Sequence, residues 1–101
     1  MIIRGTTPTH TFTLPVDVSI CSRLRAIYSQ GGTTIVKIDN DRFQRNGKVI
    51  SCTLTQEETL AFDCKKHCDI QLRVLTNAGD ALACHVEKIT VGRCLDDEVL
   101  K

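Results

Sequence analysis

The chain has 101 residues, which suits one domain and leaves no room for a second hydrophobic core. Its formal net charge is only +1, and the charge pattern gives no broad reason to bind nucleic acid or an anionic membrane. No apolar run approaches a membrane span, and the first residues lack the pattern of a signal peptide. We therefore expect a single domain over residues 1–101 that is cytoplasmic in origin and keeps its thiols reduced.

Alternation of apolar and polar residues begins early in the chain. It covers residues 9–14 and residues 22–29, as expected for two strands that each bury one face. Gly31-Gly32 then marks a turn before residues 34–38 and suggests a hairpin, whose register the sequence does not fix. Aliphatic side chains must fill most of the core, because aromatics are only 4% of the chain. The expected inward residues of the first two strands are His10, Phe12 and Leu14, followed by Leu24, Ala26 and Tyr28.

A second hairpin is expected at Asn46-Gly47. This dipeptide supplies the two positive-φ residues that a tight two-residue turn needs. The turn would place Arg45 opposite Lys48, and Phe43 opposite Ile50. The inward face of this hairpin would then consist of Phe43, Ile50, Cys52 and Leu54.

The following segment, residues 54–62, changes from a strand pattern to a helix pattern. Thr55 and Glu58 have the spacing of a capping box, in which a hydroxyl and a carboxylate satisfy free amides at the start of a helix. Leu60 and Phe62 follow closely and leave little length for further turns. We therefore predict one short helix near residues 55–61.

The last hairpin joins residues 69–76 to residues 81–91, and its register follows from matching the two inward faces. These faces meet only if the loop holds an odd number of residues. Residues 77–79 fit a three-residue bulged turn with Gly79 in the left-handed position. The matched sets are Ile70, Leu72 and Val74 against Leu82, Cys84 and Val86, with Val74 opposite Leu82 and Leu72 opposite Cys84.

Beyond this hairpin the apolar pattern changes phase. Ile89 and Val91 are out of step with the preceding inward residues, which predicts a bulge near Glu87-Lys88. From about residue 94, the acidic sequence CLDDEVLK is expected to form a C-terminal tail. Seven or eight short strands, one short helix and no regular alternation of helix with strand predict an all-β protein. We expect an antiparallel β-sandwich, either immunoglobulin-like or a small barrel.

Six cysteines raise the question of a metal or redox site, and the segment DCKKHC is the strongest candidate. Cys64 and Cys68 could supply one pair of ligands for a tetrahedral zinc site, but their spacing is not diagnostic of one. The residues that could complete the site are His67, Cys84, His85 and Cys94. Cys68 is in phase with the inward residues of its strand, as Cys52 and Cys84 are in theirs, and buried thiols behave as small hydrophobes. We predict core thiols without metal or cofactor. The alternative is a zinc-stabilised binding or regulatory module that uses the Cys64–Cys68 segment.

A small thiol enzyme is a second alternative, with less support. Cys84 and His85 are adjacent on an expected strand, where neighbours face opposite ways and cannot act together as nucleophile and base. Cys64 and His67 could meet in a turn, yet nothing nearby suggests an oxyanion hole. We therefore predict no enzymatic activity, and assign no catalytic, cofactor-binding or metal-binding residues.

Four stretches carry a resemblance to a known family over nearly the whole chain: MIIRGTTPTHTFTLP, LTQEETLAF, RVLTNAGDALA and CLDDEVL. With them, the chain resembles small prophage proteins encoded among the virion genes of Gram-positive bacteria. The hairpin LTNAGDALA is also similar to the small N-terminal β-sandwich domain of phage baseplate upper proteins. Neither family supplies functional residues, and the cysteines are not part of the shared pattern.

The resemblance implies a structural or assembly protein that acts as a protein–protein interaction module in a tail or baseplate. Its partners would be other phage structural proteins, with neither nucleic acid nor membrane, and a homo-oligomer is also compatible. It would be found in the host cytoplasm during assembly and then in the virion. Exposed strand edges and faces suit such docking. The apolar residues expected on the surface, and so the interface candidates, are Ile27, Val49 and Leu75.

Overall fold

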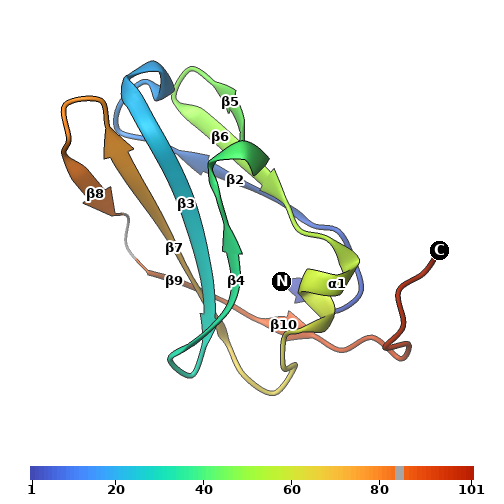
Figure 1. Ribbon diagram of the computed structural model, residues 1–101. Helices are drawn as coiled ribbons and strands as arrows, with labels where there is room; N and C mark the ends of the chain where they lie inside the picture. The colour runs from blue at the N-terminus through green and yellow to red at the C-terminus, as the bar shows by residue number, and fades with distance from the viewer. Residues whose placement is uncertain (84–85) are drawn as a thin grey trace.

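The computed structural model describes residues 1–83 and 86–101 and shows an all-β fold with one short α-helix (Figure 1). The predicted fold class is confirmed. No helix within these two ranges is long and apolar enough to cross a membrane. In chain order the elements are β1 (Ile2–Ile3), β2 (Thr9–Thr13), the 3-10 helix η1 (Val18–Ile20), β3 (Cys21–Gln30), β4 (Thr33–Ile38), the 3-10 helix η2 (Asn40–Arg42), β5 (Gln44–Asn46), β6 (Val49–Thr53), α1 (Gln56–Leu60), β7 (Cys68–Thr76), β8 (Ala81–Ala83), β9 (Glu87–Ile89) and β10 (Val91–Gly92).

Two antiparallel sheets make up most of the fold. The larger has the strand order β4-β3-β7-β8, and β9 pairs with β7 beyond β8. The smaller has the order β2-β6-β5. A third sheet pairs β1 with β10 in parallel, which the sequence did not indicate because two-residue strands are too short to show alternation. Ile2 and Val91 lie opposite each other in this pair, and both are buried.

The core lies where the inward faces of the sheets meet. In the β3–β7 register, Leu24 faces Val74, Ala26 faces Leu72 and Tyr28 faces Ile70, and all six side chains are buried as predicted. The smaller sheet adds the buried residues Ile50 and Cys52 from β6. Each large apolar side chain that is fully buried contributes about 1.5–3 kcal/mol. These aliphatic pairs therefore supply much of what holds the sheets together.

Two of the predicted hairpins form, one with a register that the sequence left open and one with the expected register. Gly31 and Gly32 form a two-residue loop between Gln30 and Thr33, and both glycines have positive φ. At the last hairpin, Val74 pairs with Leu82 as predicted. There the Thr76 amide donates to the Asp80 carbonyl at 2.9 Å, and Gly79 has a φ of +90°. Glycine chemistry in the loops thus sets both registers.

The predicted turn at Asn46-Gly47 is wrong by one position. Gly47 and Lys48 form the loop, so Asn46 pairs with Val49 and Arg45 with Ile50. Gly47 is the one loop residue with positive φ, as in a turn of type II′, whereas the predicted type I′ turn would also require a positive φ at Asn46. Two bonds from outside the hairpin hold the loop: the Leu14 amide donates to the Lys48 carbonyl at 2.7 Å, and the Val18 amide donates to the Gly47 carbonyl at 2.8 Å.

The predicted inward face of the second strand in the last hairpin is also wrong in part. Leu82 is 40% exposed and Val86 is 54% exposed. Leu82 does share a face with Val74, but β8 lies at the edge of its sheet and Leu82 lines an open groove beside the end of β2, so its side chain stays partly exposed. Cys84 and His85, including the predicted Leu72–Cys84 pair, lie outside the described residues.

The predicted bulge at Glu87-Lys88 is misplaced. Both residues pair regularly with β7, Glu87 with Ile70 and Lys88 with Asp69. The register instead changes by one residue between the Arg73–Ala83 pair and the Ile70–Glu87 pair. The change of phase read from the sequence is therefore real, but it occurs before Glu87.

Helix α1 begins where the sequence predicts. The Glu58 amide donates to Thr55 Oγ1 at 3.2 Å, and the Thr55 amide donates to Glu58 Oε1 at 2.8 Å, which completes the capping box. Arg42 in η2 donates to both carboxylate oxygens of Glu58, at 2.5 and 2.7 Å. These bonds from Arg42 hold the pKa of Glu58 below its usual value. The start of α1 is thereby fastened to the end of η2.

Candidate functional site

The DCKKHC segment forms the loop that leads from α1 into β7. Its backbone is held by the buried side chain of Gln30: the amide nitrogen donates to the Asp63 carbonyl at 2.8 Å and to the Lys66 carbonyl at 3.1 Å. The Gln30 carbonyl oxygen accepts from the Asp63 amide at 2.8 Å. The buried amide of Gln30 has all these hydrogen-bond partners, and so it holds the loop in place through protein contacts alone.

The candidate zinc ligands that lie within the described residues do not converge; Cys84 and His85 lie outside them. Cys68 is fully buried at the start of β7, Cys64 is half-buried, and His67 is exposed. Within residues 1–83 and 86–101, no three His, Cys, Asp or Glu side chains come together in a way that could hold a metal ion. The Cys64–Cys68 spacing, which suggested a zinc site, therefore brings no set of metal ligands together in the described structure.

The buried thiols lie in surroundings that oppose the thiolate form. Burial raises the pKa of Cys68 to about 11, and the charge of Asp69 acts in the same direction. Burial also raises the pKa of Cys52 and of Cys21. Since the thiolate is the nucleophile and the metal ligand, these three thiols are poorly suited to either role. The predicted burial of Cys52 and Cys68 is confirmed.

Thiol reactivity provides a direct test. We expect Cys64 and Cys94, which are half-buried, to react with iodoacetamide at least about tenfold faster than Cys21, Cys52 and Cys68, because a buried thiol reacts only after local opening. Mass spectrometry of peptides sampled over time measures each rate. In denaturant, the five rates should become similar. Rapid modification of Cys52 or Cys68 in the folded protein would instead support the thiol enzyme.

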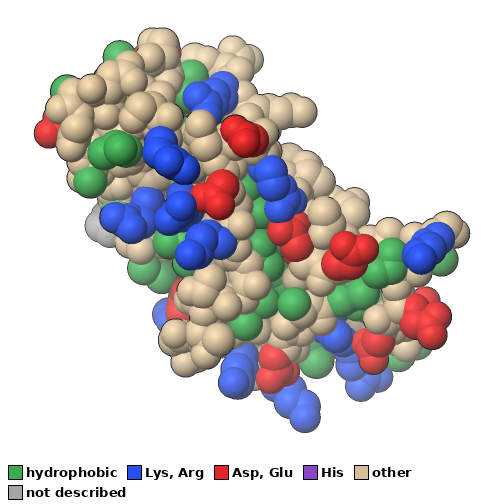
Figure 2. Space-filling view, viewed as in Figure 1, with side chains coloured by type: hydrophobic (Ala, Val, Ile, Leu, Met, Phe, Trp, Pro, Cys, Tyr) green, Lys and Arg blue, Asp and Glu red, His purple; other side chains and the backbone are tan. Residues whose placement is uncertain are grey.

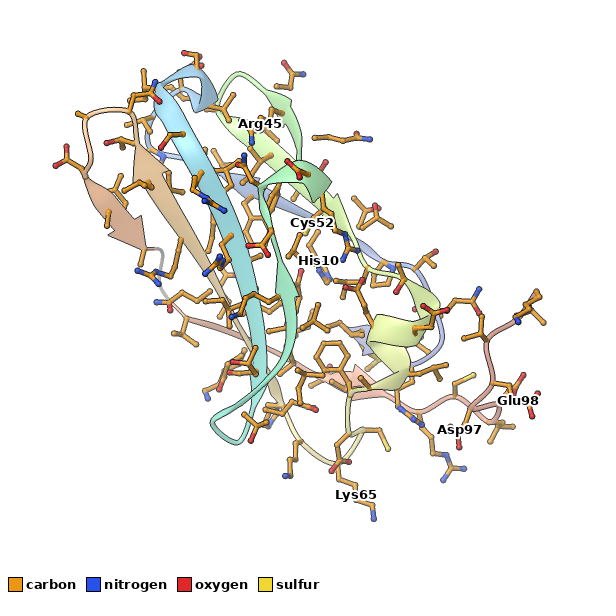
Figure 3. All side chains as sticks on the ribbon, viewed as in Figure 1. His10, Arg45, Cys52, Lys65, Asp97 and Glu98 are labelled. Atoms are coloured by element: carbon orange, nitrogen blue, oxygen red, sulfur yellow. The ribbon has the colours of Figure 1, made fainter. Side chains whose placement is uncertain are left out.

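A polar cluster that the sequence analysis missed joins the two sheets. The hydroxyl of Tyr28 lies 2.6 Å from His10 Nδ1 and 3.7 Å from Cys52 Sγ, so one side chain each from β2, β3 and β6 meet in the interior (Figure 3). Tyr28 is fully buried, and burial strongly raises its pKa. The neutral phenol can donate to His10, whose pKa is lowered by burial.

This cluster satisfies a buried hydroxyl and is a poor catalytic pair. The Tyr28 hydroxyl lies between the imidazole of His10 and the sulfur of Cys52, and the raised pKa keeps Cys52 protonated. The signal was present in the sequence, because His10, Tyr28 and Cys52 all occupy inward positions. Alternation alone, however, does not say which strands of the two sheets lie opposite each other.

The β8 edge of the larger sheet offers a different kind of site, a surface for binding another protein. An apolar groove runs between the end of β2 and the β7–β8 edge, and its central hollow encloses about 120 Å³. Leu82 lies at its mouth, and Ile20, which is 45% exposed, lies where the groove continues. We call this feature the β8 groove; its central hollow is lined by Thr13, Leu14, Pro15, Val16, Leu72, Val74, Leu82 and Ala83.

Comparison with known proteins identifies no relative. No protein-family model matches this chain, and no curated protein matches its sequence.

Proposed function

We propose that this chain is a non-enzymatic structural or assembly protein of a prophage, which acts as a protein–protein interaction module in a tail or baseplate. The observation that carries the proposal is the uncovered β8 groove, where an edge strand lies beside an apolar hollow. The resemblance to virion-gene products points to the same role. Its partners would be other phage structural proteins, met in the host cytoplasm during assembly and retained in the virion.

The backbone of β8 is suited to strand addition. The Thr76–Asp80 pair is hydrogen bonded, so the alternating antiparallel pattern directs the amide and carbonyl of Leu82 toward Val74. The backbone groups of Ala81 and Ala83 are then directed to the outer edge, where no other described strand pairs. Their small side chains leave that edge accessible. An extended segment of a partner can therefore pair with β8 and place apolar side chains in the groove beside Leu82.

Co-expression with the products of neighbouring genes, followed by pull-down, tests this function. We expect the chain to capture a tail or baseplate subunit. Leu82→Lys should reduce that capture by about 10- to 100-fold, because an apolar contact worth about 1.5–3 kcal/mol is lost. Val49→Lys is the matched control, since Val49 is 38% exposed against 40% for Leu82 but lies outside the groove.

Two results would count against the proposal. The first is that no virion product is captured by the unmodified chain. The second is that Leu82→Lys and Val49→Lys reduce capture equally, which would show that the β8 groove is not the binding surface.

A further inference from the structure

A group of cations lies on the outer face of the larger sheet. We call this group the basic face: Arg23 and Arg25 on β3, Arg73 on β7 and Lys37 on β4. Arg25 and Arg73 lie directly opposite each other in the β3–β7 register, a placement in which like charges repel. Figure 2 shows Lys and Arg side chains gathered over this part of the molecule. Such an arrangement is stabilised by an anionic partner.

The basic face is incompletely neutralised within the chain. Arg25 Nε donates to Asp39 Oδ1 at 2.8 Å. In the part of the chain that the structure describes, Arg23, Arg73 and Lys37 have neither an ion pair nor a side-chain hydrogen bond. A shallow cleft is lined by Arg23, Arg25 and Arg73 and is bordered by Leu75 and Ala81. It combines planar donors for carboxylates with an apolar border.

The complementary surface is present on the same chain. Residues 95–100, which we call the acidic segment, contain three consecutive acids, Asp96, Asp97 and Glu98. Asp97 accepts from Arg4 at 2.7 Å, whereas Asp96 and Glu98 have no ion pair in the described residues. The acids lie between two apolar side chains that project into solvent, Leu95 at 91% exposure and Leu100 at 77%.

The two surfaces lie at opposite ends of the molecule. The basic face covers the upper parts of β3 and β7, while the acidic segment extends past α1 and β10, where Figure 3 shows Asp97 and Glu98 (Figure 1). The longest dimension of the molecule is 46 Å. The net charge of +1 therefore conceals two local groups of like charge, although Figure 2 also shows Lys and Arg side chains near the lower end. The acidic segment of a second copy carries charge that is complementary to the basic face.

We propose that the acidic segment of one copy docks on the basic face of the next, so that the chain assembles head to tail. The carboxylates of Asp96 and Glu98 bind the guanidinium groups of the cleft, and Leu95 or Leu100 packs on Leu75, which is 37% exposed. Because the two surfaces differ, the contact is heterologous and extends into a ring or a filament. This inference rests on the proposed interaction role and names one partner, a second copy.

The strength of this contact should depend on salt. Exposed ion pairs are individually weak and are screened as ionic strength rises. We expect sedimentation velocity at low salt to show a mass that grows with concentration. In about 1 M salt, where the Debye length falls to about 3 Å, the protein should sediment as a monomer.

Charge reversal tests the pairing itself. The face variant carries Arg23→Glu and Arg73→Glu and keeps the Arg25–Asp39 ion pair, and the segment variant carries Asp96→Lys and Glu98→Lys and keeps the Arg4–Asp97 ion pair. Each variant alone should self-associate at least about tenfold more weakly. Their equimolar mixture should associate with the two variants alternating, because the intact segment then meets the intact face and the reversed segment meets the reversed face. The chain with all four substitutions should recover self-association.

The control variant, Lys65→Glu with Lys66→Glu, has the same net charge as the face variant but changes an exposed loop. It should self-associate like the unmodified chain. A chain that stays monomeric at low salt, or a control as weak as the face variant, would overturn the inference. So would a face variant that still self-associates but no longer captures a virion product, because the basic face would then serve a different acidic protein. Capture of a virion subunit by a strictly monomeric chain would leave the proposed function intact and remove this inference alone.

Discussion

Replacing Phe62 with alanine is expected to lower the free energy of unfolding by about 3–5 kcal/mol. Phe62 follows α1 directly and is only 2% exposed. Its ring packs edge-on against the ring of Tyr28 at a centroid distance of 6.2 Å. This contact holds the end of the helix against the core. The neighbouring strands are held in their sheets and cannot collapse fully into the space, so a cavity remains. Urea unfolding followed by circular dichroism measures the loss.

Phe12→Ala is the matched control for this substitution. Phe12 belongs to β2 and is partly buried against the same core. Its truncation removes the same atoms from a less enclosed position, so the loss should be clearly smaller than for Phe62. Equal losses for the two variants would show that the helix end is no more tightly packed than the face of the edge strand β2.

The parts of the fold that could be predicted from sequence depend on local rules. A strand with one buried face must alternate, which is why the inward residues of β3 and β7 were identified correctly. Positive φ at Gly31, Gly32 and Gly79 is inexpensive only for glycine, so the places of two hairpin turns followed from their positions, and for the last hairpin the register did too. The capping box at Thr55 is equally local, and it marked the start of α1.

The sequence-based predictions were wrong where contacts with distant segments select one of several locally allowed structures. At Gly47, either of two turn types suits the sequence, and the choice between them is fixed by amides of Leu14 and Val18 that bond to the loop. At Leu82, alternation gives the face of the strand correctly, but it does not show whether the opposite sheet extends far enough to cover that face. Neither outcome can be derived from the residues of the hairpin alone.

The same limit applied to the candidate sites. The Cys64–Cys68 spacing is conspicuous in sequence, yet its loop is held by Gln30, which lies more than 30 residues earlier at the end of β3. The basic face was hidden for a similar reason. Arg25 and Arg73 are far apart in sequence, and only the β3–β7 register places them opposite each other. Charge counted along the chain gives +1 and misses this clustering.

Thr59 provides the second large effect on stability, because it joins α1 to the segment between β1 and β2. Its side chain is fully buried. Oγ1 donates to the Thr6 carbonyl, 2.8 Å away, and accepts from the Gly5 amide at 3.0 Å. Gly5 has a φ of +81°, a left-handed conformation that glycine adopts readily. The bond from its amide to the Thr59 hydroxyl helps to hold it in this conformation.

Thr59→Val should therefore lower the free energy of unfolding by about 1–3 kcal/mol, because valine keeps the shape of threonine but leaves the part-buried Gly5 amide and Thr6 carbonyl without this partner. Urea unfolding measures this loss, and hydrogen exchange should show weaker protection of the Gly5 amide. Thr33→Val, at an exposed position in β4, is the control and should change stability by less than about 0.5 kcal/mol. If Thr59→Val were as harmless as the control while the Gly5 amide stayed protected, the hydroxyl would not be what fastens this segment to the helix. The contact between α1 and this segment would then have to depend on apolar packing and on the Arg4 guanidinium, which donates to the Leu60 carbonyl at 2.9 Å.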